Sequence, residues 1–210
     1  MKAMKRIWNS VAWSEKALLA MLLALLATLV SVPTARSANE SPLLRLAAPV
    51  HKMVGDPGGR CSAVMIAPSR ALTAAHCTAI PNAALEIDGA SYPVSGSFPV
   101  KEGLDLAVII VPSAPCPCAT LARESSALGS LVYVVGYPRG LLRVVTFGLF
   151  QGSVTPSDYD GNTYGVTDAR TAPGNSGGGV FNDVGELLGI STATDGHITL
   201  FVELPSLGVK

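Results

Sequence analysis

The sequence lacks the features that would indicate a helical, nucleic-acid-binding or metal-binding protein. After residue 37 no stretch has a long apolar stripe with the 3.6-residue period of an amphipathic helix. Lysine and arginine form no basic patch, and no block of like charge suggests a tail. There is no internal repeat. The 3 histidines and 4 cysteines offer few metal ligands, so we expect no metal and no cofactor.

The first 37 residues have the composition of a secretory signal. Met1–Lys16 carries four basic residues and one acid, whereas Ala17–Val32 has no charge and consists mostly of leucine and alanine. Ala35-Arg36-Ser37 then offers small residues at the positions that a signal peptidase reads. We expect export with cleavage after Ser37. An uncleaved anchor is the alternative, although this apolar run is shorter than the roughly 20 residues of a spanning helix.

Removing this segment changes the charge balance. The chain has 15 basic and 15 acidic residues, but five of the basic ones and a single acid lie in the first 37 residues. The remainder is therefore net acidic. We expect it in the periplasm or secreted, without stable membrane insertion once the signal is cleaved. It is long enough to bury a full core.

After residue 60 the sequence alternates between short apolar runs and turn residues such as Asp88-Gly89 and Asp195-Gly196. The Ala/Gly/Pro-rich stretch from Pro112 to Gly129 interrupts this series. The pattern predicts an all-β protein of two packed six-stranded antiparallel barrels, residues 38–113 and 114–210, with an active site in the cleft between them. The expected strands are Cys61–Ala67, Ala71–Thr73, Ala84–Ile87, Ser91–Val94, Leu106–Val111, Leu131–Gly136, Val144–Leu149, Thr163–Thr167, Gly179–Phe181, Leu187–Thr192 and Ile198–Val202.

Three motifs follow one another in an order that suits nucleophilic catalysis. His76 lies in Thr-Ala-Ala-His-Cys, Asp105 opens an apolar run, and Ser176 lies in Gly-Asn-Ser-Gly-Gly. The glycines permit a sharp turn that presents a hydroxyl and two amide hydrogens together. Histidine, with a pKa of about 6.5, can take the proton of the serine, and a carboxylate can orient it. Taken singly, each residue could be an ordinary turn or core residue; their order favours catalysis.

The Gly-x-Ser-x-Gly pattern also occurs in α/β-hydrolases, where the serine precedes the acid and the histidine. The candidates would then be Ser176, Asp183 or Asp195, and His197. That fold alternates helices with parallel strands, and this sequence does not have that pattern. His51 and His197 lie in no motif, and we interpret both as surface or turn residues.

These motifs resemble those of trypsin-like serine peptidases with the chymotrypsin fold, in particular the peptidase domain of HtrA-type (DegP-like) proteases. The resemblance covers about Cys61 to Pro205. It implies a serine endopeptidase with His76, Asp105 and Ser176 as the catalytic triad, an acyl-enzyme intermediate, and the backbone amides of Gly174 and Ser176 as the oxyanion hole. Further segments that carry it are Val134–Pro138, Val145–Gly148, Thr167–Ala169, Pro173–Gly178, Gly185–Ile190 and Phe201–Pro205.

The resemblance also supports a disulfide between Cys61 and Cys77. Such a bridge would pin the histidine turn to the preceding strand and stabilise the fold by about 3 kcal/mol in the chain-entropy model. Cys116 and Cys118 are not part of the family's pattern. A bridge between them, free thiols and an intermolecular link all stay open.

Specificity depends on the position six residues before Ser176, which holds Arg170. An arginine in the pocket for the residue before the scissile bond (P1) would favour an acidic P1 side chain. We favour the alternative, in which Arg170 faces solvent or pairs with Asp168. The pocket would then be small and apolar, with walls formed by Ile190, Ser191, Thr192 and Ala193.

The expected partner is a protein or peptide substrate, and homo-oligomer formation is left open. The chain ends at Lys210, so we expect no PDZ domain and no regulation by a peptide tail in cis. Asn175 stands where digestive relatives have an aspartate that binds a freed N-terminus, so activation by cleavage is not expected. The alternative function is a silent or latent homologue that binds peptides. Loss of a triad member would favour it, but all three are present.

Overall fold

The computed structural model describes residues 42–157 and 161–208, so the expected signal segment lies outside the described residues. The all-β prediction is confirmed. No helix in these ranges is long and apolar enough to cross a membrane. The strands are β1 Val50–Gly55, β2 Gly59–Ala67, β3 Arg70–Thr73, β4 Ala84–Ile87, β5 Ala90–Pro93, β6 Gly96–Pro99, β7 Ala107–Ile110, β8 Leu131–Gly136, β9 Val144–Val154, β10 Tyr164–Thr167, β11 Gly179–Asn182, β12 Leu187–Thr194 and β13 Thr199–Glu203. The helices are α2 Pro42–Ala47 and the 3-10 turns η1 Ala75–Ala79, η2 Pro138–Gly140 and η3 Pro205–Leu207.

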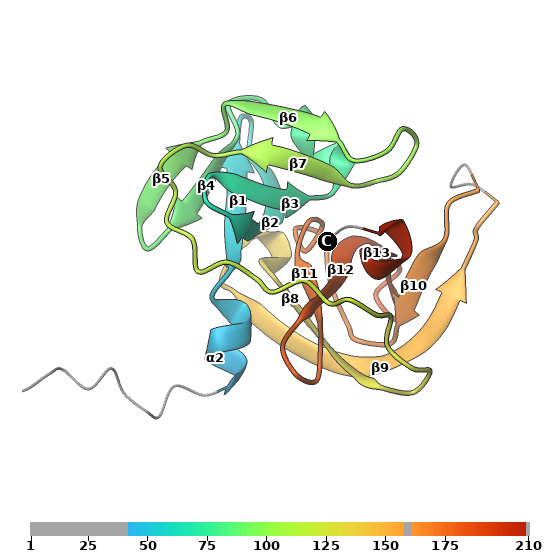
Figure 1. Ribbon diagram of the computed structural model, residues 1–210. Helices are drawn as coiled ribbons and strands as arrows, with labels where there is room; N and C mark the ends of the chain where they lie inside the picture. The colour runs from blue at the N-terminus through green and yellow to red at the C-terminus, as the bar shows by residue number, and fades with distance from the viewer. Residues whose placement is uncertain (1–41, 158–160, 209–210) are drawn as a thin grey trace, which may run out of the picture. The chain divides into compact units, whose positions relative to one another are not determined.

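Strands β1 to β7 form one antiparallel sheet in the order β5-β4-β1-β2-β3-β7-β6 (Figure 1). Two of its strands, β1 and β6, were not predicted. Strand β1 carries His51 and Lys52 within its apolar residues, and every residue of β6 is exposed. Neither strand therefore has the continuous or alternating apolar pattern by which the others are detected.

Strands β8 to β13 close into a six-stranded antiparallel barrel in the order β10-β13-β12-β11-β8-β9. Strand β9 continues to Val154, beyond the Leu149 at which the sequence predicted its end, and a bulge at Val166/Thr167 adjusts its pairing with β10. The predicted chymotrypsin-like two-barrel fold is confirmed, with one closed barrel and one half-barrel.

The apolar residues fall into three groups, and one of them is shared by both sheets. One group, with Met53, Met65 and Leu85, fills the first sheet, and a second, with Val132 and Phe150, fills the barrel. The third combines first-sheet residues with barrel residues: Val50, Val64, Leu72, Leu104, Leu106, Val135, Phe181, Leu187, Ile190 and Val202 are among its members. The shared group holds the two sheets together.

Strand β2 explains how polar residues reach this interface. Successive side chains of a strand point to opposite faces. Cys61, Ala63 and Met65 belong to the core of the first sheet, whereas Val64 belongs to the shared group. Ser62 alternates with the inward-facing residues, and it is fully buried (0% exposed). It therefore lies on the face that meets the barrel.

The connection between the sheets contains the second cysteine pair, which the structure joins as a Cys116–Cys118 disulfide with Cα atoms 4.8 Å apart. On one side of it, Ala114 packs into the core of the first sheet. On the other side, the Ala119 amide donates to the Met65 carbonyl at 2.9 Å, and Leu121 forms a bridge with Leu187. The disulfide thus lies in the segment that passes between the two sheets.

The interpretation of His51 as a surface or turn residue is wrong. His51 lies on β1 with only 4% of its surface exposed, and its Nε2 atom has no hydrogen-bond partner among the described residues. Burial, reinforced by the charge of Arg143, lowers the pKa of His51 to about 4. His197 is an exposed turn residue, as expected.

The buried His51 should make the fold sensitive to mild acid. Its pKa of about 4 in the folded chain lies below the value of about 6.5 in an unfolded chain. Between these values the unfolded state binds more protons, so the free energy of unfolding falls as the pH drops. We expect a loss of about 2 kcal/mol between pH 7 and pH 5. His51→Phe, which cannot titrate, should lose correspondingly less in urea unfolding at the two pH values. Equal losses in parent and variant would contradict this prediction.

Candidate active site

The His76 imidazole is held at the end of β3 by a short turn and a disulfide. The chain leaves β3 and enters η1, where the Cys77 amide donates to the Ala74 carbonyl at 3.0 Å. The Cys61–Cys77 disulfide, with Cα atoms 6.1 Å apart, ties this turn to β2. A ring nitrogen of His76 and the two sulfurs lie within 4.8 Å of one another. Because both sulfurs are joined to each other, they offer no thiolate to a metal.

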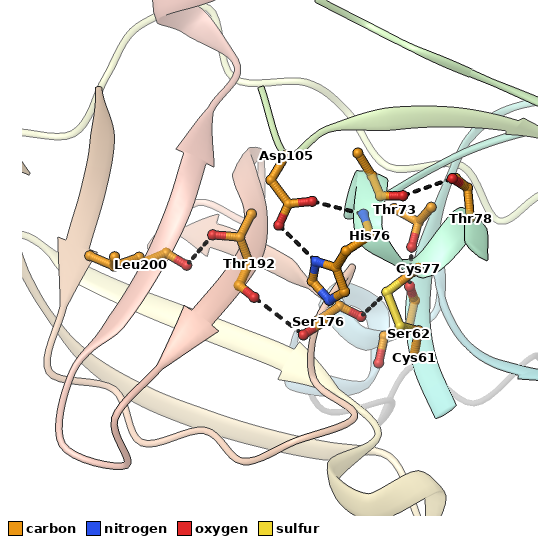
Figure 2. A network of polar contacts seen from close by, with 11 residues as sticks. Cys61, Ser62, Thr73, His76, Cys77, Thr78, Asp105, Ser176, Thr192 and Leu200 are labelled. Atoms are coloured by element: carbon orange, nitrogen blue, oxygen red, sulfur yellow. Dashed lines mark hydrogen bonds and ion pairs between the residues drawn. A yellow bond between two sulfur atoms is a disulfide. The ribbon is translucent and has the colours of Figure 1, made fainter. Parts of the chain in front are cut away.

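Asp105 contacts both the ring and the backbone of His76. Its Oδ2 lies 2.8 Å from the His76 Nδ1, and its Oδ1 accepts the His76 backbone N–H at 2.9 Å (Figure 2). The carboxylate therefore fixes the ring relative to its own backbone. A proton on Nδ1 leaves Nε2 as the acceptor of the neutral ring.

The same contacts set the acidities of the two groups. The hydrogen bond with Asp105 raises the pKa of His76 and outweighs the opposite effect of burial. Burial alone would raise the pKa of Asp105, but the hydrogen bonds from His76 and from the Ala75 backbone together lower it. The contacts between the two residues therefore favour the ionised form of Asp105 beside the His76 imidazole.

Ser176 comes from the barrel, in the loop between β10 and β11. Its carbonyl accepts the Ser62 amide at 2.7 Å and lies 3.7 Å from the Cys77 Sγ. Ser176 and His76 thus flank the same disulfide, and Figure 2 shows the imidazole between Asp105 and Ser176. Within the described residues the Ser176 hydroxyl donates to the Thr192 carbonyl, at 3.2 Å, and not to His76.

Two peptide planes of this loop have their carbonyls bonded away from Ser176. The Pro173 carbonyl accepts the Arg139 amide at 2.6 Å, and the Asn175 carbonyl accepts the Gly178 amide at 2.7 Å. In a trans peptide the N–H points opposite to the C=O, and the described chain has no cis peptide bond. The amides of Gly174 and Ser176 are therefore turned to the other side, where no described residue accepts them.

Gly174 and Gly177 make this loop conformation possible. Both have positive φ angles, 98° and 83°, which glycine adopts readily. A Cβ on Gly174 would lie 2.6 Å from the Tyr137 carbonyl oxygen, and one on Gly177 would lie 2.0 Å from the Ser62 carbonyl oxygen. The loop approaches both sheets too closely for any side chain at these positions.

The predicted substrate-binding residues lie beside Ser176 on β12 and before the loop. Ile190, Ser191 and Thr192 are buried and Ala193 is half-buried, and the Ser191 carbonyl accepts the Gly177 amide at 2.8 Å. Arg170 is exposed and forms no ion pair with a described residue.

Asp168 does not bind Arg170. Its carboxylate instead accepts the Leu149 amide at 2.7 Å and the Gln151 Nε2 at 3.2 Å. Both donors belong to β9, so these bonds tie the segment before Arg170 to the barrel. The Arg170 side chain is therefore exposed and is not paired with Asp168.

Ser62 and Arg139 hold the loop around Ser176, and no sequence motif pointed to either residue. Both lie far from this loop in sequence, and Arg139 acts through its backbone amide, which no side-chain pattern reveals. The alternation along β2 was a usable signal for Ser62, because a polar residue between apolar ones faces the opposite side of the strand.

The fold and the arrangement of His76, Asp105 and Ser176 at the junction of two sheets define a class, the two-barrel chymotrypsin-like proteins. The model of the trypsin-like peptidase domain matches residues 61–190, more than half of the chain. The protein therefore belongs to the trypsin-like peptidase family.

Relatives with similar sequences are named as DegP-like serine endoproteases. A probable periplasmic serine endoprotease, DegP-like, of Chlamydia trachomatis is 33% identical over 113 residues, which are 50% of this chain and 23% of the relative. Its namesake in Chlamydia pneumoniae is 32% identical over 127 residues, 57% of this chain and 26% of the relative. The chain thus spans about a quarter of the length of these relatives.

Solved structures show the same likeness. The active form of the Rv3671c protease from M. tuberculosis has a TM-score of 0.69 at 22% identity, covering 80% of this chain and 81% of that one. The HtrA-type protease AlgW with a tripeptide also has a TM-score of 0.69, at 25% identity, covering 77% and 58%. The resemblance to HtrA-type peptidase domains is confirmed.

Replacing Asp105 should lower the pKa of His76. Asp105→Asn keeps the side-chain shape but removes the negative charge and replaces one of the two acceptor oxygens by an NH2 group, so the contacts that raise the pKa of His76 are weakened. An NMR titration of the His76 Cε1 proton measures the change. Asp195→Asn is the matched control, because Asp195 accepts the His197 amide at 2.8 Å and should leave His76 unaffected. An unaltered His76 titration in Asp105→Asn would show that the carboxylate does not set this pKa.

Proposed function

We propose that the protein is an exported serine endopeptidase that hydrolyses peptide bonds through His76, Asp105 and Ser176. The observation that carries this proposal is the two-point contact of Asp105 with His76 on one sheet. Opposite this pair lies a serine loop of the other sheet, in which the amides of Gly174 and Ser176 have no acceptor among the described residues. Family membership and the names of the relatives support the same activity.

The first step requires the Ser176 hydroxyl to leave the Thr192 carbonyl and to donate to the His76 Nε2. Its oxygen then attacks the substrate carbonyl carbon while the proton passes to Nε2, and the electron pair of the C=O bond moves to the oxygen. Asp105 stabilises the imidazolium that results. About half of the His76 side chain is exposed (51%), so a substrate can reach the ring.

The Gly174 and Ser176 amides would bind the negative oxygen that forms in this step. Losing one such donor typically costs about 3 kcal/mol of transition-state stabilisation. When the intermediate collapses, the C–N bond breaks and the imidazolium gives its proton to the leaving amine. The resulting ester on Ser176 is hydrolysed by water, which His76 deprotonates in the same way, and the hydroxyl is restored.

The pKa shift of His76 predicts the pH range of this activity. Only the neutral ring can accept the serine proton. Because Asp105 raises the pKa of His76, a larger fraction of the rings stays protonated near neutral pH. Activity therefore rises as the pH passes through a value above the ordinary histidine pKa of about 6.5.

Export belongs to the proposal for three reasons. The first 37 residues have the order of a basic segment, an apolar run and small residues that is typical of a secretory signal. In addition, the names of the Chlamydia relatives describe them as periplasmic. A disulfide beside the active site fits an oxidising compartment.

A latent homologue that binds peptides is the second candidate. The observation in its favour is the Ser176 hydroxyl, which is bonded to the Thr192 carbonyl. A serine held in that way is not activated until it turns toward His76. Catalytic hydrogen bonds are often looser without substrate, so we rank this candidate second.

A fluorophosphonate probe separates the two candidates. It labels a serine only when a base activates the hydroxyl. We expect the exported protein to be labelled at Ser176, and Ser176→Ala and His76→Ala to lose labelling by at least about 100-fold. Ser157→Ala, at an exposed serine, is the control and should be labelled like the parent. A folded, disulfide-intact parent that resists labelling would favour the latent binding module.

For substrates we propose a small apolar P1 residue. Arg170 is exposed, while the stretch from Ile190 to Ala193 lies beside Ser176, whose hydroxyl donates to the Thr192 carbonyl, and contains no charged residue. We therefore expect kcat/KM for peptides cleaved after Val or Ala to exceed that for the matched Glu peptide by about tenfold, because burying an unpaired carboxylate is costly. Faster cleavage after Glu, abolished in Arg170→Gln, would instead assign Arg170 to the pocket.

A further inference from the structure

One buried serine of the first sheet contacts the loop Ala172–Gly178, here called the nucleophile loop, at two points. The Ser62 amide donates to the Ser176 carbonyl at 2.7 Å, and the Ser62 hydroxyl donates to the Gly174 carbonyl at 2.9 Å. The same hydroxyl accepts the Tyr137 amide at 2.9 Å. With 0% exposure, Ser62 makes these bonds away from solvent, where they are stronger than in water.

The carbonyl that Ser62 binds belongs to the peptide between the two oxyanion donors. The donor amides are those of Gly174 and Ser176, and the Gly174–Asn175 peptide links them. Its N–H is also bonded, because the Asn175 amide donates to the Ala172 carbonyl at 3.0 Å. The planes on either side are held by Arg139 and Gly178. The Ser62 hydroxyl is therefore the one side-chain donor, among described residues, that fixes a carbonyl of this loop from the other sheet.

We propose that Ser62 is a positioning residue for the oxyanion hole, an inference that rests on the function proposed above. By holding the Gly174 carbonyl, its hydroxyl sets the angle between the two amides that bind the developing negative oxygen. The Tyr137 amide orients this hydroxyl, because its bond occupies one lone pair and leaves the proton for Gly174. Tyr137 immediately precedes η2, whose Arg139 holds the neighbouring plane.

Without the hydroxyl, the Gly174 carbonyl and the Tyr137 amide lose a buried partner. The middle peptide plane is then held only by the bond from the Asn175 amide to the Ala172 carbonyl. It can rotate away from its position, because Gly174 restricts its backbone angles little. A rotated plane misdirects the donors on both sides but leaves His76, Asp105 and the substrate wall on β12 in place. The loss should therefore appear in the transition state and not in substrate binding.

The test compares Ser62→Ala with the parent in two measurements. The first is cleavage of whichever P1 peptide the parent cleaves faster, and the second is binding of a peptide boronic acid of the same sequence. A boronic acid forms a tetrahedral adduct with the serine and needs the hole, as the transition state does. We expect kcat to fall about tenfold or more with KM within about twofold, and boronate affinity to fall by the same factor as kcat/KM. Ser62→Thr, which keeps the hydroxyl, should recover most of kcat.

Thr73→Val is the matched control. Thr73 is as buried as Ser62, and its hydroxyl donates to the Ser62 carbonyl at 2.8 Å. Its oxygen packs beside Gly177, but it makes no hydrogen bond to the nucleophile loop. It should lose stability with kcat within about threefold of the parent. All assays run at a temperature at which circular dichroism shows every variant folded.

The outcomes separate the two proposals. An active parent and an equally active Ser62→Ala, or equal losses of kcat in Ser62→Ala and Thr73→Val, would overturn the role of Ser62 and leave the peptidase assignment intact. An inactive parent that also resists the fluorophosphonate would overturn the proposed function and this inference with it. A fall in kcat confined to Ser62→Ala, matched by the boronate, supports the positioning role.

Discussion

The packing of the two sheets against each other is the constraint on which the candidate site depends. His76 and Asp105 belong to the first sheet and Ser176 to the barrel. Their relative positions are therefore set by the shared apolar group, in which Val64 and Leu72 of one sheet meet Val135 and Ile190 of the other. Close-packed apolar residues resist displacement, so they can hold the two halves of a site that no local turn could bring together.

Polar contacts add direction to this packing. An apolar interface fixes how far apart the sheets lie, but hydrogen bonds determine how individual groups are turned. In this protein such hydrogen bonds come from the face of β2 that carries Ser62. Ser62 faces the barrel, whereas its neighbours Cys61 and Ala63 face the core of the first sheet. Because side chains alternate along β2, one face of the strand packs into the core of the first sheet, and the other face contacts the loop that carries Ser176.

The sequence predicted most of the strands, because apolar runs between turn residues are a direct consequence of half-buried sheets. It did not predict β6, which is exposed throughout, or the buried position of His51. The candidate residues could be chosen because short motifs surround them. The direction of the Ser176 hydroxyl and the roles of Ser62 and Arg139 could not, since these depend on contacts between different segments of the folded chain. The Ser176 hydroxyl bonds the Thr192 carbonyl (separation 16), and the Ser62 hydroxyl bonds the Gly174 carbonyl (separation 112).

The first sheet is open, and both of its edge strands end in proline, β5 at Pro93 and β6 at Pro99. An unpaired strand edge is a template on which another extended chain can add itself. Proline has no backbone N–H to offer to such a chain, and it interrupts the ladder at that point. The fold can therefore leave one barrel unclosed while discouraging aggregation along its free edges.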